Sequence, residues 1–161
     1  MTTTAIAIAD RITQLIIKEW EAQGHNLTGE FIRQIDYDIK QDGDSVRLLI
    51  YDNTERGYGK ILDDGVQADR IKYPYARARI DGLTNYGKLR LGLQDKQARS
   101  FAFAVATKHA REGMPLPSST RFSRTGKRTK FVEDATKEIT KIVQEEVNKT
   151  VRQWLSQLQQ I

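Results

Sequence analysis

The sequence IDYDIKQDGDSVRLLIYD, residues 35–52, decides the fold class of this chain. In its first half apolar residues alternate with polar ones, which is the period of a β-strand. The central Asp42-Gly43-Asp44 is a turn signal, and the second half is rich in residues that favour strands. We therefore predict an antiparallel hairpin, or small sheet, in which residues 35–41 pair with residues 45–52.

Helical periodicity on both sides of this hairpin makes the predicted class α+β. An amphipathic N-terminal helix is predicted over residues 5–22, with Gly24 just beyond its end. A central helix is predicted over residues 95–112, and its middle is apolar nearly all round, so we expect it to be covered on more than one side. Residues 57–65 are predicted to form two turns of helix that end at Gly65.

The chain ends in its longest helical pattern, which keeps apolar spacings of three and four for about eight turns. Its apolar positions are Val132, Ala135, Ile139, Ile142, Val143, Val147, Val151, Trp154, Leu155 and Leu158. Such a stripe indicates core or a seam between subunits rather than a ligand groove. Periodicity leaves open whether it packs on the hairpin of its own subunit or on a neighbour.

Two segments, residues 66–93 and 113–130, are predicted to be extended basic loops or arms. The first combines basic residues with glycine, asparagine and Pro74, and the second has two prolines, five basic residues and no acid. With a length of 161 residues, we expect a single domain over residues 1–161 that carries these two arms.

Composition excludes several classes of protein. The chain has no cysteine, which rules out disulfides, cysteine-ligated zinc, iron–sulfur clusters and thiol nucleophiles. Its apolar runs are too short to cross a bilayer, and its N-terminus lacks the pattern of a secretory signal. We therefore expect a soluble intracellular protein with no membrane partner.

The net charge of +5 is distributed unevenly along the chain. Residues 1–69 carry 7 Lys/Arg and 13 Asp/Glu, a net −6, whereas residues 70–130 carry 15 and 3, a net +12. Residues 131–161 carry 4 and 5, a net −1. A basic middle can bind nucleic acid, or it can bind the acidic part of a neighbouring copy, and the charges alone favour neither.

The sequence offers little for catalysis or metal binding. Its two histidines, His25 and His109, fall in a turn and on the central helix, and we interpret both as structural or exposed. Paired carboxylates such as those at 36/38 and 63/64 are interpreted as solvated charges, and no phosphate-binding glycine loop occurs. We predict no enzyme activity, no catalytic or metal-ligating residue and no cofactor.

Aromatic residues interleaved with basic ones in the two predicted loops form the candidate binding surface. We expect this surface to contact neighbouring subunits, other proteins or phosphates. Its candidate residues are Arg70, Lys72, Tyr73, Tyr75, Arg77, Arg79, Arg121, Phe122, Arg124, Lys127, Arg128 and Lys130.

Three short motifs follow one another along the chain. They are LTGEF at 27–31, YGKILDDG at 58–65 and RTKFV at 128–132. In this order they resemble the tail-completion proteins, also described as minor tail, neck or head–tail joining proteins, of lambda-like tailed bacteriophages. The positions that match the family pattern are Thr28, Gly29, Tyr58, Leu62, Asp63 and Gly65. Asp63 stands where the family usually has Glu, and both basic loops are longer than in a minimal member.

This resemblance implies a virion structural protein, assembled in the host cytoplasm, that forms a ring at the junction of head and tail. The family implies about six or twelve copies, contacts with portal or connector and tail proteins, and genomic DNA in the channel. It implies no catalytic residues. The alternative from the residues is a DNA-binding module that recognises no sequence and uses Arg121, Arg124, Lys127 and Arg128 on phosphates.

Overall fold

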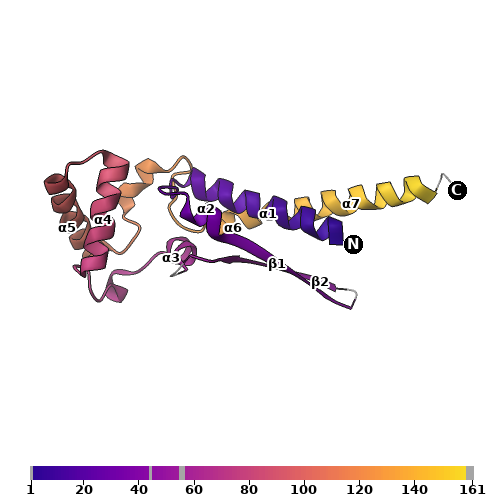
Figure 1. Cartoon of the computed structure of the whole chain (residues 1–161), viewed down its shortest axis with the longest axis horizontal. Coiled ribbons are helices and arrows are strands. Elements are labelled where there is room, and N and C mark those ends of the chain that lie inside the picture. The colour runs from indigo at the N-terminus through magenta and orange to yellow at the C-terminus, as the bar shows by residue number, and fades with distance from the viewer. Residues whose placement is uncertain (1, 44, 55–56, 159–161) are drawn as a thin grey trace.

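The computed structural model describes residues 2–43, 45–54 and 57–158 and confirms the α+β class (Figure 1). The molecule is elongated, with α4 and α5 at one end and the hairpin tip and the end of α7 at the other (Figure 1). The elements are α1 (Thr2–Ala22), α2 (Glu30–Gln34), β1 (Ile35–Asp42), β2 (Ser45–Asp52), α3 (Tyr58–Asp64), η1 (Ala68–Arg70), α4 (Arg77–Leu91), α5 (Asp95–Glu112), η2 (Pro117–Phe122), α6 (Phe131–Thr136) and α7 (Ile139–Leu158).

The predicted hairpin is confirmed, and its register determines which face is apolar. β1 and β2 are antiparallel, with Ile35 opposite Asp52 and Ile39 opposite Leu48. Since side chains alternate across a strand, one face carries the isoleucines of β1 with Leu48 and Ile50, and the other carries the aspartates of β1. The apolar face lies toward α1, and the acidic face is exposed.

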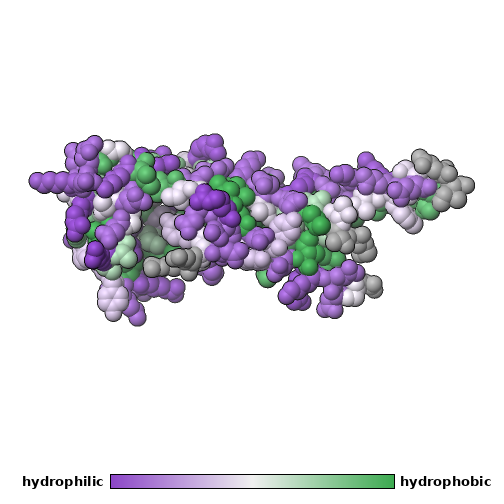
Figure 2. Space-filling view, viewed as in Figure 1, coloured by the Kyte–Doolittle hydropathy of each residue, from purple (hydrophilic) through white to green (hydrophobic). Residues whose placement is uncertain are grey.

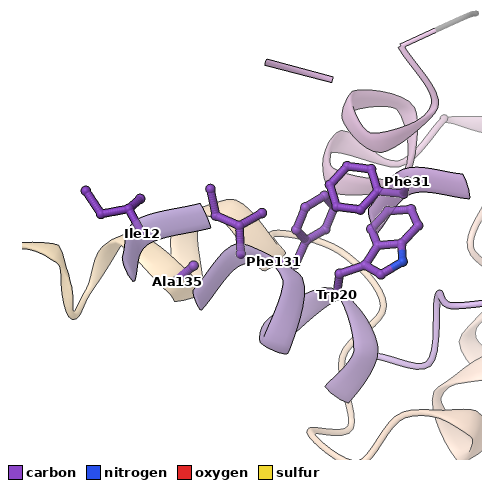
Figure 3. Packing of buried hydrophobic residues seen from close by; sticks show 6 residues of the cluster. Ile12, Trp20, Phe31, Phe131 and Ala135 are labelled. Atoms are coloured by element: carbon purple, nitrogen blue, oxygen red, sulfur yellow. The ribbon is translucent and has the colours of Figure 1, made fainter. Parts of the chain in front are cut away.

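The main core lies where α1, α2 and α6 meet (Figure 3). Trp20 stacks on Phe31 with ring centroids 4.0 Å apart, and Phe131 meets both rings edge-on. Ile12 and Ala135 continue this core along α1 and α6 (Figure 3). Large aromatic rings supply much of the apolar area that a small core can bury.

The C-terminal helical segment is confirmed, but it is not continuous. Phe131 opens α6 after Lys130, whose φ of 60° lies in the left-handed region. A tighter turn at residues 137–138, where the Glu138 N–H donates to the Ala135 carbonyl at 3.3 Å, separates α6 from α7. Periodicity did not indicate this break because the apolar spacing continues through it.

The prediction of an extended arm over residues 66–93 is wrong. This segment contains η1 and the fifteen-residue helix α4. Helix α4 ends at Leu91, and Gly92 forms its C-cap with a φ of 66°. The sequence pattern did not predict this helix, because its packed face consists only of Ile80, Leu83 and Gly87. The rest of the segment is rich in glycine and basic residues, which are typical of a loop.

Helix α4 packs on α5 through small residues that let the two backbones approach closely. The fully buried positions of α5 are Ala98, Ala102 and Ala106, one per turn. A Cβ placed on Gly87 of α4 would lie only 3.0 Å from the Phe101 Cδ1 atom. The predicted bounds of α5 are confirmed, but its cover on several sides is not, because Phe103 and Ala104 in its middle stay exposed.

Residues 113–130 are irregular apart from η2 and one bridge, as predicted, but they do not project as an arm. The bridge joins Val66 to Met114, with N···O distances of 2.7 and 2.8 Å. Further along, the Arg124 N–H donates to Ala22 O at 2.8 Å and the Lys130 N–H to Asp63 O at 2.8 Å. The segment therefore lies against the ends of α1 and α3.

Candidate functional site

The candidate residues of the first basic segment surround the start of α4. Arg70, Lys72, Tyr73, Tyr75 and Arg77 are all exposed. Tyr73 is the most exposed of the large apolar and aromatic side chains, at 78%. Tyr75 stacks on Phe103 of α5 with centroids 6.2 Å apart, and the Arg99 guanidinium lies 5.8 Å from the centroid of the Phe103 ring.

Arg79 differs from its neighbours because it points into the α4–α5 interface. One of its Nη2–H groups lies 3.0 Å from His109 Nδ1, and it also donates to the Met114 sulfur at 3.5 Å. Burial, helped by the charge of Arg79, lowers the pKa of His109 to about 4. Both side chains therefore act within the fold, which is the structural role predicted for His109.

The basic residues of the second segment are divided between solvent and internal contacts. Arg121 stacks over the neighbouring Phe122 ring, 4.7 Å from its centroid, and Arg124 is exposed. Lys127 pairs with Asp134 at 2.7 Å, and Lys130 pairs with Glu133 at 3.3 Å. These pairs leave Arg121 and Arg124 as the cations most accessible to a partner.

Arg128 supports the end of α1. Its Nη1 atom donates to the carbonyls of Gln23 at 2.7 Å and Gly24 at 3.1 Å. These carbonyls belong to a helix end, where backbone acceptors lack intrahelical donors. Burial lowers the pKa of the guanidinium. The hypothesis that Arg128 contacts DNA phosphates is therefore not supported by its geometry.

The family-motif positions lie at the start of α2 and along α3, where the chain contacts the hairpin and α6. Gly29 begins α2 with a φ of 73°, and the Thr28 hydroxyl accepts from the Glu30 N–H at 3.4 Å. Tyr58 opens α3, and Leu62 packs on the main core. The Asp63 side chain accepts from the Val132 N–H at 2.9 Å.

Two glycines of the same region are required by close contacts. Gly65 ends α3 with a φ of 71°. A Cβ on Gly59 would lie 2.5 Å from Phe31 Cε2 and 2.8 Å from Asp52 Oδ2. Asp52 itself accepts from the Gly59 N–H at 2.7 Å and the Thr54 hydroxyl at 2.9 Å. The motif positions thus hold the fold together.

An apolar groove of about 1110 Å³, here called the α1–hairpin groove, lies between α1, the hairpin and α7. Ile8 and Ile12 of α1 form its floor, and Leu48 and Ile50 of β2 form one wall. The other wall is α7, which contributes Ile139, Val143, Val147 and Val151. Figure 2 shows hydrophobic side chains between the first turns of α1 and the hairpin. The groove is open, because Val46, Val147 and Val151 remain substantially exposed.

Helix α7 is fixed on α1 and then continues past it. Arg11 pairs with Glu145 at 2.7 Å and with Glu146 at 2.9 Å. Near the start of α1, the Thr4 and Thr150 hydroxyls lie 2.8 Å apart. The residues after Thr150 therefore extend beyond the start of α1, and they expose Trp154, Leu155 and Leu158 (Figure 1).

His25 is buried among aromatic rings of the main core. His25 packs between Trp20 and Phe131, and burial, with the nearby charge of Arg128, lowers its pKa to about 4. In the described ranges no three potential metal-ligating side chains cluster. Nor does any helix among these residues combine the length and apolar character needed to cross a bilayer.

Sequence reasoning identified the apolar stripe of α7 but not the groove beside it. No sequence pattern indicated the groove, because its shape depends on how α1, the hairpin and α7 are arranged in space. Comparison with protein-family models, with curated proteins and with solved structures finds no match to this chain.

Proposed function

We propose that this chain is a virion structural protein of a tailed bacteriophage that forms a ring in the neck, at the head–tail junction. The observation that carries the proposal is the separation of charge along the elongated molecule. Residues 70–112, which include α4 and α5, carry ten Lys/Arg and three Asp/Glu, a net +7. At the opposite end, the hairpin residues 35–52 carry two Lys/Arg and five Asp, a net −3 (Figure 1).

Opposite charges on different surfaces favour a head-to-tail interface between identical subunits. A head-to-tail interface forms a ring when the rotation between successive subunits adds up to a full turn. The order of the family motifs supports the phage assignment, with portal or connector and tail proteins as neighbours and the virion neck as the location. In this role the chain needs contact surfaces and no active site.

The assembly can be tested with two substitutions on the exposed face of β1. Asp38 and Lys40 are two residues apart on this face, so both side chains are exposed to the same part of the surface. Asp38→Lys makes the hairpin less acidic and should weaken assembly, whereas Lys40→Glu makes it more acidic and should strengthen assembly. Both substitutions affect exposed side chains and should leave the fold unchanged.

Light scattering after size exclusion, at low and high salt, measures the outcome. The proposal expects a ring whose mass falls as salt rises, with the two variants shifted in opposite directions. Equal profiles for both variants would show that the charged ends do not hold the subunits together. A discrete dimer in place of a ring would count against the neck assignment.

A second candidate function, DNA binding without sequence preference, is favoured by the exposed aromatic cluster beside α4. Tyr73, Tyr75 and Phe103, with Arg99 over the last ring, combine stacking surfaces with positive charge. The two functions are compatible, since a basic surface in a neck ring would face the passing genome. Fluorescence anisotropy with labelled DNA at several salt concentrations tests it. Binding should weaken steeply with salt, and a flat response would reject it.

A further inference from the structure

The α1–hairpin groove and the free end of α7 are two apolar surfaces of one chain that do not contact each other. The groove is concave and lies beside the proximal part of α7. The free end, residues 152–158, is a convex helical stripe with Trp154 59% exposed. Apolar surfaces of this extent on a folded chain indicate contact with another macromolecule.

We propose that the α1–hairpin groove of one copy binds the free end of α7 of a second copy. The inference rests on the proposed function, because it adds an apolar contact between adjacent ring subunits to the contact between their oppositely charged ends. The occupant is helical, and Trp154, Leu155 and Leu158 are the side chains that enter the groove.

Helix α7 cannot fill its own groove. It forms one wall of the groove between Ile139 and Val151 and then continues as the same helix away from it (Figure 1). Arg11 and Thr4 fix the direction of this helix on α1. The stripe beyond Val151 can therefore reach only the groove of another molecule.

The lengths of the two surfaces agree. The exposed part of the α7 wall runs from Val143 to Val151, nine residues, or about 12 Å of helix. The free end, residues 152–158, presents seven residues, or about 10 Å of helix. The free end can therefore cover most of the wall.

The charges around the two surfaces also favour this pairing. The free end carries Arg152 and no acid, whereas the charged side chains that line the groove are Asp52, Asp63 and Lys60, a net −1. Pairing of two α7 stripes with each other would bring like charges together and would leave the apolar face of the hairpin uncovered. These charges select the groove of a second copy over a symmetric helix pair.

The absence of cysteine makes a crosslinking test specific, since each introduced thiol is unique. One batch carries Val46→Cys in the groove, and the other carries Leu158→Cys on the stripe. The two batches are mixed and treated with a short bismaleimide. The matched control is Ser156→Cys, which lies half a helical turn away on the opposite face of α7.

The expected result is a crosslinked dimer from Val46→Cys mixed with Leu158→Cys, and at least a tenfold lower yield with Ser156→Cys. Equal yields with the control, or efficient crosslinking of Leu158→Cys alone, would overturn the inference, the latter by showing that α7 stripes pair with each other. A wild-type chain that stays monomeric at every concentration would overturn it as well.

Substitution of the stripe provides a second measurement that does not depend on crosslinking geometry. Trp154→Ser should raise the dissociation constant for self-association at least tenfold while leaving the circular dichroism spectrum unchanged, because the side chain is exposed in the isolated subunit. A salt-sensitive ring that tolerates Trp154→Ser would reject this interface and retain the neck proposal. A Trp154-dependent closed dimer would retain the interface and reject the ring.

Discussion

Replacing Arg128 by alanine separates a structural role of this side chain from a role in binding DNA. The guanidinium donates to the carbonyls of Gln23 and Gly24, so its removal leaves two acceptors at the end of α1 without these donors. A hydrogen bond to a charged group contributes about 1.5–3 kcal/mol to stability. Part of the total is offset because the alanine variant no longer buries a charge.

We therefore expect Arg128→Ala to lower the free energy of unfolding by about 2–3 kcal/mol. For a chain of this length, that loss corresponds to a decrease in Tm of roughly 5–10 °C. Urea unfolding followed by far-ultraviolet circular dichroism measures the free energy. The matched control is Arg124→Ala, an exposed arginine of the same segment, for which a change within about 0.5 kcal/mol is expected.

Equal stability of the two variants would show that Arg128 does not stabilise the end of α1. Equal stability, together with a larger loss of DNA affinity for Arg128→Ala than for Arg124→Ala, would restore Arg128 to the phosphate-binding surface. If the structural role is correct, Arg124→Ala is the variant whose DNA affinity depends less steeply on salt, because one phosphate contact contributes about 0.9 to the log–log slope.

The remaining predictions concern close packing and pH. Gly59→Ala should lower the free energy of unfolding by about 1–3 kcal/mol, because the new methyl group would meet Phe31 and Asp52. Gly82→Ala, on an open face of α4, should instead raise it by about 0.5–1 kcal/mol, and thermal unfolding of both variants checks the contrast. The pKa of His25, about 4, lies below its usual 6.5, so the stability that comes from the neutral imidazole is complete above pH 6.5. It should be lost as pH falls towards 4, and His25→Phe should reduce this slope in urea titrations at successive pH values.

Periodicity predicted the elements that have a wide apolar face. It did not predict α4, which packs through small residues. The hairpin and α5 have their predicted bounds to within a residue, because alternating or helical apolar patterns extend along them. Helix α4 buries chiefly Ile80 and the backbone at Gly87, so most of its sequence resembles a basic loop. A helix that packs chiefly through one isoleucine and one glycine leaves no apolar stripe for sequence analysis to detect.

The candidate surface was predicted by charge, and charge does not distinguish a cation that faces solvent from one that supports the fold. Tyr73, Tyr75 and Arg124 are exposed as expected, whereas Arg79 and Arg128 donate to groups inside the molecule. The groove was not predicted because a concave surface depends on how three separate elements diverge. Each of those elements shows in sequence only that one of its faces is apolar.

The bridge between Val66 and Met114 brings together the two ends of the segment that contains α4 and α5. This segment therefore begins and ends at two residues whose backbones are hydrogen-bonded to each other. The pair has its own small cluster of Ile80, Ala102 and Ala106, separate from the main aromatic core. Such an arrangement allows insertion, loss or exchange of the whole unit during evolution without rebuilding the remainder. It also offers protein engineers a site at which residues 67–113 can be replaced by a short linker.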